Sequence, residues 1–457
     1  MFYPVGEIMS DMPRLAIVGT NSGCGKTTAV LALESALLKR GLPVTSFKCG
    51  PDYIDGAFHR RLQHIDCYNL DSIFLNDAEL KRHFAEHAQN KFSIIEGVMG
   101  MFDGVGSDGK GSSFEIATKL KIPTVLIINA RGMSTSVRAV IRGFKEFSDD
   151  QIDGVIFTNI SKMTYPMLEE CCIKENVRCY GFLPSDKKIA FESRHLGLVG
   201  SGEIEDFNEK MEYLGSLAEE HIKIDELIEL AYTADALKSE ESYEDEFKND
   251  CPLTMAVARD DAFCFIYQEN LDILENMNVK IVYFSPISDD RLPSDIDALY
   301  LPGGYPELHL DELSSNYGML KDIKERVEGG LPTLAECGGF LYLHRSVDGR
   351  TLVSLFDESA TKESRLQNFG YGTLESKNDN LMFRRGESTY VHEFHYYSST
   401  DVGDTCVKTK LRNGVQNDCV VSSDTLFAGF PHLYFPSNLN MVRNLIRHMK
   451  EFREAHR

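Results

Sequence analysis

The sequence predicts an α/β fold built from two doubly wound domains, each with a mostly parallel sheet covered by helices. Three observations predict it. Short apolar runs of strand length alternate with helical segments in two blocks of the chain. An acidic stretch separates these blocks. The chain has 457 residues, which is more than one hydrophobic core usually serves, since single domains seldom exceed about 250 to 300 residues.

The first block opens with a strand, a glycine-rich loop and a helix. Residues 14–19, RLAIVG, are typical of a buried strand, and the helical spacing that follows runs up to Gly41, a plausible C-terminal stop. Further strands are expected at 43–48, 92–97, 123–129, 154–159 and 178–184. Because strands linked by helical crossovers pair in parallel, we expect a parallel sheet with helices on both faces.

The domain boundary is expected in the acidic stretch. Residues 237–250, LKSEESYEDEFKND, carry eight charged side chains in fourteen, and few are apolar. The alternation then restarts, with strands expected at 253–260, 280–286 and 297–304 and a helix across 262–277. We therefore expect a first domain at 1–200, an acidic helical connector at 201–250 and a second domain at 251–457.

Composition excludes several classes of function. The formal net charge of −22 would repel a nucleic acid backbone or an anionic membrane. The first residues lack a basic start followed by an apolar run, and the longest apolar run, 122–130, has about half the length needed to cross a bilayer. Eleven cysteines without a CxxC pair favour reduced thiols over disulfides or structural zinc. We expect a soluble, cytoplasmic protein.

The stretch GTNSGCGKTT, residues 19–28, predicts a phosphate-binding loop. Its end follows the usual spelling, but the first glycine stands one position early, at Gly19 instead of Thr20. Loop N–H groups and the helix N-terminus would hold phosphates, Lys26 would reach the outer phosphates, and Thr27 could hold Mg²⁺. The expected ATP-binding residues of the loop are Gly23, Gly25, Lys26, Thr27 and Thr28.

Two groups of acids follow strands of this first block. KCGPDYID places Lys48, Asp52 and Asp55 after the strand at 43–48, and IIEGVMGMFDG places Glu96 and Asp103 after the next expected strand. Any one of these acids could equally be a solvated surface group. Together, at equivalent strand ends of one sheet, they favour a site for a metal ion and phosphoryl transfer.

These motifs resemble the N-terminal half of cobyrinic acid a,c-diamide synthases, and the long loop is similar to that of dethiobiotin synthetase. Partition ATPases are also similar, but they carry an extra lysine where this chain has Asn21. The resemblance implies ATP and Mg²⁺ as cofactors. It implies the metal ligands Thr27, Asp52 and Glu96. Around the transferred phosphate and the substrate it places Lys48, Asp52, Tyr53, Asp55 and Asp103.

Two further positions of this half carry less specific signals. Ile54 stands where the family has leucine, which bears on the fit of the substrate. Asn159 ends the strand at 154–159, where this fold usually reads the adenine edge, although an asparagine there is often only a turn former.

In the second block, LPTLAECGGFLYL at 331–343 reads as a short strand, a cysteine, two glycines and a helix start. A thiol on such a tight turn is exposed above the sheet, and the helix N-terminus stabilises its thiolate. Cys337 is thus a candidate nucleophile. Alone, the segment would fit a buried cysteine in a glycine turn better than a nucleophile.

Other segments supply candidates for the oxyanion donors and for the base that a nucleophile needs. The strand in ALYLPGGYPE, residues 298–307, ends in Gly303 and Gly304, which could offer N–H groups to an oxyanion. Candidate bases are His392 and His395 in VHEFHYYS and His432 in FAGFPHLYFPSN.

Together these segments resemble a class I glutamine amidotransferase domain, which implies His432 as the base and places His392 and His395 near the substrate or an interdomain surface. Most such domains carry a glutamate two residues after the histidine, where this chain has Tyr434. Cobyrinate-amidating enzymes lack it too. The absence implies a weak glutaminase when the domain acts alone.

The resemblance spans roughly 14–445 and implies a ligase that amidates the a and c acetate carboxylates of cobyrinic acid with ATP and glutamine, through acyl phosphates. Nickel-sirohydrochlorin or hydrogenobyrinic acid are alternative substrates that the motifs do not separate. A nucleotide-dependent regulatory protein, or a dethiobiotin-type ligase with an accessory domain, are alternatives of another class. No nucleic acid or membrane partner is expected, and a homodimer is a possible assembly.

Overall fold

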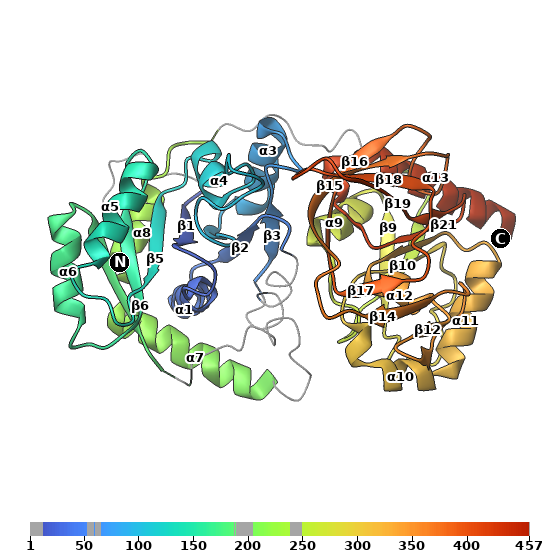
Figure 1. The fold of residues 1–457 in the computed structure, drawn as a ribbon, viewed down its shortest axis with the longest axis horizontal. Helices are drawn as coiled ribbons and strands as arrows, with labels where there is room; N and C mark the ends of the chain where they lie inside the picture. The colour runs from blue at the N-terminus through green and yellow to red at the C-terminus, as the bar shows by residue number, and fades with distance from the viewer. Residues whose placement is uncertain are drawn as a thin grey trace. The chain divides into compact units, whose positions relative to one another are not determined.

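The computed structural model describes residues 12–52, 59, 65–186, 188, 204–237 and 249–456. The chain divides into two compact units, Met1–Ser242 and Tyr243–Arg457. Both are built around a parallel sheet (Figure 1), which confirms the α/β class. Among the described residues, no helix is both long enough and apolar enough to cross a membrane.

The sheet of the first unit has seven strands in the order β3-β2-β4-β1-β5-β6-β7, and all pairs are parallel. The strands are β1 (Arg14–Gly19), β2 (Val44–Cys49), β3 (Cys67–Leu70), β4 (Phe92–Glu96), β5 (Thr124–Asn129), β6 (Gly154–Ile160) and β7 (Arg178–Pro184). The six predicted strands are confirmed. Strand β3 was not predicted, because its four residues, CYNL, are too few to show a periodicity.

Helices cover both faces of this sheet. They are α1 (Lys26–Lys39), α3 (Asp77–Ala88), α4 (Ser113–Lys119), α5 (Val137–Phe147), α6 (Tyr165–Lys174), α7 (Ile204–His221) and α8 (Ile224–Tyr232). The apolar sides of α1, α7 and α8 share one core with β1, β4 and β5. Figure 1 shows α3 and α4 on the other side of the sheet from α1.

The region expected to be a connector differs from that expectation, since α7 and α8 belong to the core of the first unit. Their apolar residues lie on one face of each helix, which packs on α1 in the case of α7 and on β1 and β7 in the case of α8, while the acidic side chains face solvent. The core residues of this segment are Met211, Leu214, Leu217, Ala218, Ile222, Ile224, Leu227, Ile228 and Ala231. The acidic side chains of α7 and α8 therefore lie on the solvent side of helices that cover the sheet, and most of the acidic stretch at 237–250 lies outside the described residues.

The main sheet of the second unit has the order β20-β21-β11-β10-β8-β9. Its strands are β8 (Leu253–Ala258), β9 (Val279–Phe284), β10 (Ala298–Leu301), β11 (Thr333–Glu336), β20 (Val421–Ser422) and β21 (Leu426–Gly429). All pairs are parallel except β20 with β21. The helices are α9 (Gln268–Asn276), α10 (Leu310–Ser315), α11 (Tyr317–Glu328), α12 (Gly338–Tyr342) and α13 (Leu439–His456). The expected helix at 262–277 thus begins later, at Gln268.

Two smaller sheets, which the sequence did not predict, complete this unit. One has the order β13-β12-β14-β17 and the other the order β19-β18-β15-β16-β22. Their strands are β12 (Ser346–Val347), β13 (Arg350–Thr351), β14 (Ser359–Lys362), β15 (Asn368–Ser376), β16 (Ser388–His395), β17 (Tyr397–Ser399), β18 (Cys406–Lys410), β19 (Gln416–Cys419) and β22 (His432–Leu433). Strand β22 fixes His432 beside β16.

Candidate active site

The glycine-rich loop joins β1 to α1 in the first unit. Gly25 precedes the helix with a φ of 98°, a conformation that favours glycine. A Cβ on Gly19 would lie 2.4 Å from Sγ of Cys24 and 2.8 Å from Cδ of Lys26. The early glycine therefore leaves room for the stem of Lys26. The ammonium of Lys26 donates to the carbonyl oxygens of Asn21 and Met99, so it lies over the loop.

The end of β6 lies against this loop. The Thr158 hydroxyl donates to the Cys24 carbonyl at 2.6 Å, and a Cβ on Gly25 would lie 3.1 Å from the Thr158 methyl carbon. Asn159 follows, with a φ of 58°, at an irregularity in the pairing of β6 with β7. The fold thus places Asn159 next to a residue that contacts the loop. Its expected contact with adenine stays a prediction, as does the nucleotide contact of half-buried Thr28.

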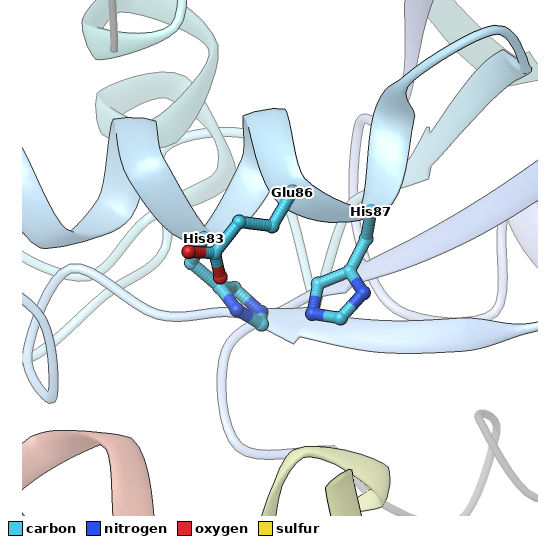
Figure 2. Close-up of side chains that lie close together, drawn as sticks. All are labelled: His83, Glu86 and His87. Carbon is cyan, nitrogen blue, oxygen red and sulfur yellow. The ribbon is translucent and has the colours of Figure 1, made fainter. Parts of the chain in front are cut away.

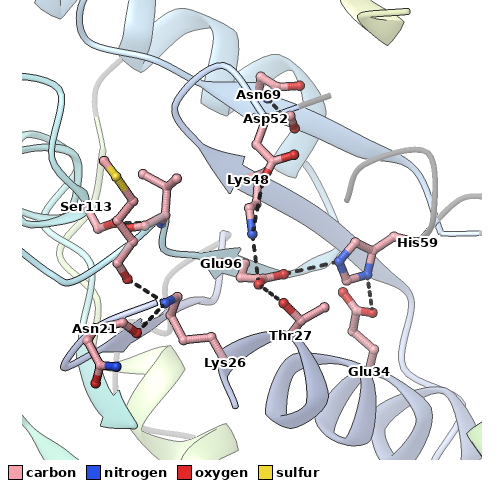
Figure 3. A network of polar contacts seen from close by, with 12 residues as sticks. Asn21, Lys26, Thr27, Glu34, Lys48, Asp52, His59, Asn69, Glu96 and Ser113 are labelled. Atoms are coloured by element: carbon pink, nitrogen blue, oxygen red, sulfur yellow. Dashed lines mark hydrogen bonds and ion pairs between the residues drawn. The ribbon is translucent and has the colours of Figure 1, made fainter. Parts of the chain in front are cut away.

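Three of the expected residues, Lys48, Thr27 and Asp52, lie around Glu96 (Figure 3). Lys48 on β2 and Glu96 on β4 are direct partners in the sheet, and Nζ of Lys48 lies 2.8 Å from Oε1 of Glu96. The Thr27 hydroxyl donates to the same oxygen at 2.7 Å. Asp52 joins this group through Lys48, with Oδ2 at 3.8 Å from Nζ. Hydroxyl and carboxylate oxygens this close are a donor set that fits Mg²⁺.

The sequence did not reveal that Glu96 has a further buried partner, His59, which itself contacts a second buried carboxylate, Glu34. Nε2 of His59 lies 3.3 Å from Oε2 of Glu96, and Nδ1 lies 2.8 Å from Oε2 of Glu34 on α1 (Figure 3). Burial disfavours the charged imidazole, yet the two carboxylates outweigh it and raise the pKa of His59 well above its usual value. The one signal in the sequence was Glu34 itself, an acid inside the apolar run of α1.

Burial would also raise the pKa of Glu96, but the nearby Lys48 and His59 outweigh it and hold that pKa well below its usual value. Glu96 is therefore an ionised carboxylate in a buried site. An ionised oxygen ligand facing the phosphate loop is what a divalent cation would need.

Of the two remaining expected acids, Asp103 and Asp55, the structure describes only Asp103. Asp103 is exposed, and its Oδ2 accepts a hydrogen bond of 2.8 Å from the N–H of Gly100, so it closes the turn after β4. The same turn contacts the phosphate loop, because Met99 accepts from Lys26. Tyr53 and Asp55 lie outside the described residues, and so does Ile54.

In the second unit, Cys337 lies on the turn between β11 and α12. Its φ of 46° and ψ of −99° are unusual for a residue with a side chain. The turn is held by hydrogen bonds from the Cys337 N–H to the Gly429 carbonyl, 2.8 Å, and from the Leu341 N–H to the Cys337 carbonyl, 3.0 Å. Burial, together with the charges of Glu307 and Glu393, raises the pKa of the thiol. Such a thiol needs a base to ionise it.

The loop with the two glycines lies beside this turn. A Cβ on Gly338 would be 3.0 Å from the backbone nitrogen of Gly304. A Cβ on Gly303 would be 2.4 Å from Cε1 and 3.3 Å from Nε2 of His432. The structure therefore brings together the cysteine turn, the glycine pair and the ring of His432.

Two more side chains lie around His432. Glu336, the residue before the cysteine, has its Oε2 at 3.7 Å from Nδ1 of His432, and the sequence did not single it out. His392 is the strand partner of His432 and is buried, and burial, with His432 nearby, lowers its pKa to about 3. His395, on the same strand, stacks on Phe430 with ring centroids 3.8 Å apart. Inside this unit, His392 is thus a neutral neighbour of the expected base.

A separate group of potential metal ligands lies on α3. The ligand atoms of His83, Glu86 and His87 lie within 4.8 Å of one another (Figure 2). Both imidazoles pack on Tyr68, with centroids 3.6 Å away for stacked His87 and 6.2 Å for edge-on His83. Burial, with His83 and Lys91 nearby, lowers the pKa of His87 to about 2. The contacts with Tyr68 account for both rings as packing partners.

Comparison with known protein families assigns a domain to each half of the chain. Residues 15–199 match the model of the CobQ/CobB/MinD/ParA nucleotide binding domain, and residues 254–439 match that of the CobB/CobQ-like glutamine amidotransferase domain.

Similarity to single proteins extends over nearly the whole chain. The cobyrinate a,c-diamide synthase of Clostridium acetobutylicum is 38% identical over 444 residues, which cover 95% of this chain and 100% of that protein. The synthases of Clostridium tetani, 36% identical over 95% of this chain and 100% of theirs, and of Streptococcus sanguinis, 36% identical over 96% of this chain and 100% of theirs, match similarly. The resemblance drawn from the motifs is thereby confirmed: this chain belongs to the cobyrinate a,c-diamide synthase family.

Proposed function

We propose that this chain is a glutamine-hydrolysing, ATP-dependent ligase that amidates the a and c acetate carboxylates of cobyrinic acid in cobalamin biosynthesis. The observation that carries the proposal is that one chain holds two complementary sites. One is the cysteine turn with the glycine pair and His432. The other is the phosphate loop with Thr27, Lys48 and Glu96. An ionised carboxylate is a poor electrophile, so amide formation needs both activation and a neutral nitrogen nucleophile.

The second unit would supply the nitrogen. His432 takes the proton of the Cys337 thiol, and the sulfur attacks the side-chain amide carbon of glutamine. The N–H groups of the Gly303–Gly304 loop stabilise the oxyanion that forms. The proton passes from His432 to the leaving group, ammonia departs, and water hydrolyses the thioester to release glutamate and restore the thiol.

The first unit would supply the activation. A substrate carboxylate attacks the γ-phosphorus of ATP, ADP leaves, and an acyl phosphate forms. Ammonia then attacks the acyl carbon and displaces phosphate, which gives the amide. Lys26 and the loop N–H groups position the phosphates and neutralise charge. Thr27, Asp52 and Glu96 would hold Mg²⁺, which neutralises phosphate charge when bound.

Two other tetrapyrroles are close alternatives to cobyrinic acid as the substrate. Hydrogenobyrinic acid and nickel-sirohydrochlorin would need the same two-site chemistry. Cobyrinic acid is favoured because the relatives that match over almost the whole chain are cobyrinate a,c-diamide synthases. Since ATP and glutamine are cytoplasmic metabolites, we place the reaction in the cytoplasm.

The test incubates the full chain with ATP, Mg²⁺, glutamine and each candidate tetrapyrrole in parallel, and follows the products by mass spectrometry. We expect two successive amidations of cobyrinic acid. Amidation of hydrogenobyrinic acid or nickel-sirohydrochlorin alone would overturn the substrate assignment, and no ATP turnover with any substrate would overturn the ligase.

A second measurement tests whether the second unit supplies the nitrogen and the first unit activates the carboxylate. The variant Cys337→Ala should lose amidation with glutamine and keep it with ammonium chloride, because free ammonia bypasses the second unit. Release of ammonia from glutamine by this variant at the wild-type rate would remove Cys337 from the mechanism.

A further inference from the structure

Glu336 is a buried carboxylate whose position is fixed from two sides. It is the last residue of β11 and directly precedes Cys337. Its Oε1 accepts a hydrogen bond of 3.0 Å from the N–H of Leu433, and its Oε2 accepts one of 2.8 Å from the Tyr300 hydroxyl. The residue is 1% exposed. The oxygen held by Tyr300 is also the one that lies 3.7 Å from Nδ1 of His432.

Position 434 does not supply a carboxylate to His432. Tyr434 stands where a glutamate would follow the histidine, and its hydroxyl donates to Oε1 of Glu269 at 3.4 Å. The ring of Tyr434 is buried and packs edge-on against Tyr267, with centroids 5.1 Å apart. The histidine therefore has its carboxylate neighbour on a different element, the strand that carries the cysteine.

The ring of His432 has two edges with different surroundings. Nδ1 faces the carboxylate of Glu336, while Cε1 and Nε2 face Gly303, whose loop lies beside the cysteine turn. A proton on Nδ1 would point at Glu336 and leave Nε2 able to accept a proton from the thiol. A buried anion also favours the imidazolium that forms when the proton arrives.

We propose that Glu336 is the positioning residue of His432 and takes the place of the missing glutamate at position 434. It holds the tautomer with the proton on Nδ1 and stabilises the imidazolium during glutamine hydrolysis. The distance of 3.7 Å shortens to a hydrogen bond when the imidazole becomes charged. This inference rests on the proposed roles of Cys337 and His432.

The test compares Glu336→Gln with the matched control Glu269→Gln in the full chain. Both substitutions neutralise a buried carboxylate beside the β22 segment, but Glu269 contacts Tyr434 and Glu336 faces His432. We expect Glu336→Gln to lower the kcat of glutamine hydrolysis by about 100-fold or more with little change in KM, since loss of an orienting carboxylate leaves the wrong tautomer. Glu269→Gln should stay within a few-fold of wild type.

One further readout separates positioning from a structural role. Amidation with ammonium chloride should be unchanged in Glu336→Gln. Hydrolysis within two-fold of wild type, or equal losses with glutamine and with ammonia, would overturn the proposal.

Tyr300→Phe keeps the inference testable if Glu336→Gln does not fold. This variant removes only the hydroxyl that fixes Oε2 of Glu336, and we expect a drop in hydrolysis of about tenfold with unchanged use of ammonia. An unaltered rate of hydrolysis would count against the proposal. Cys337→Ala separates a failure of the proposed function from a failure of the role given to Glu336. If this variant still hydrolyses glutamine, Cys337 is not the nucleophile, whatever the Glu336 variants show.

Discussion

The imidazole of His432 lies where a side chain on Gly303 would have to go. A Cβ on Gly303 would be 2.4 Å from Cε1 of the ring, which is closer than real Cβ contacts come. Gly303 does not have a positive φ, so its backbone could be adopted by any residue. The absence of a side chain at this position therefore serves the position of the histidine and not the shape of the turn.

Gly303→Ala should abolish most glutamine hydrolysis. The added methyl group must displace the His432 ring, and a shift of about 1 Å in a catalytic group costs on the order of 100-fold in rate. Amidation with ammonium chloride should continue at the wild-type rate. The assay is ammonia release from glutamine beside amidation with each nitrogen source.

The matched control for this substitution is Gly143→Ala in α5. A Cβ there has no heavy atom within 4 Å, and the residue lacks a positive φ. It should leave both nitrogen sources unaffected. If Gly303→Ala hydrolyses glutamine at the rate of this control, then hydrolysis does not depend on the observed position of the His432 ring.

The backbone of Cys337 should store strain that a stability measurement can reveal. A residue with a Cβ pays about 1 to 3 kcal/mol to hold such a conformation, whereas glycine adopts it freely. Cys337→Gly should therefore be more stable than Cys337→Ala, although both lack the thiol. We expect a difference of about 1 kcal/mol after the greater chain entropy of unfolded glycine is included.

Thermal unfolding of the two variants, followed by a signal from the second unit, checks this expectation. A matched pair at a helical position of the first unit, Gly143 and Gly143→Ala, is followed by a signal from that unit and should show the opposite order, since alanine favours a helix. If Cys337→Ala were the more stable variant of its pair, the turn would hold no strain.

The charge of Glu307 should control the reactivity of Cys337 toward alkylation. Burial raises the pKa of the Glu307 carboxyl to about 7, and the charge of Glu307 in turn raises the pKa of the thiol. Glu307→Gln removes that charge, so the thiol loses its proton more readily and reacts faster. The gain should be several-fold at pH 8 and should vanish near pH 6, where Glu307 is already protonated.

The rate of modification of Cys337 by iodoacetamide, read by peptide mass spectrometry, measures this effect. Glu328→Gln, an exposed acid at the end of α11, is the control and should leave the rate unaltered. A gain that is equal at pH 6 and pH 8 would contradict an electrostatic origin.

Much of the site could be predicted because its residues belong to short motifs that are continuous in the sequence. The phosphate loop and the cysteine turn each need a strand, small residues and a helix start in order, and that order is visible in the sequence. Parallel pairing of β2 with β4 places Lys48 beside Glu96, and the sequence predicted only that acid clusters lie at equivalent strand ends.

The rest depends on contacts between distant segments that leave no local pattern. His59 meets Glu34, 25 residues away, and Glu336 meets the N–H of Leu433, 97 residues away. The two smaller sheets of the second unit include strands of two residues, such as β12 and β22, which cannot show an alternation. Position 434 was read correctly as lacking a carboxylate, but the sequence did not indicate that one lies nearby on β11.

Glu96→Gln should abolish amidation with either nitrogen source and spare glutamine hydrolysis. The substitution keeps the shape of the side chain but removes the charge that faces Thr27 and Lys48. A neutral amide is a poorer ligand for a divalent cation, and loss of charge neutralisation on the phosphates should cost several kcal/mol, which is on the order of 100-fold or more in rate. ATP turnover and amidation are measured with glutamine and with ammonium chloride. Glu146→Gln on the exposed side of α5 is the control, and amidation by Glu96→Gln at the rate of that control would show that phosphoryl transfer occurs elsewhere.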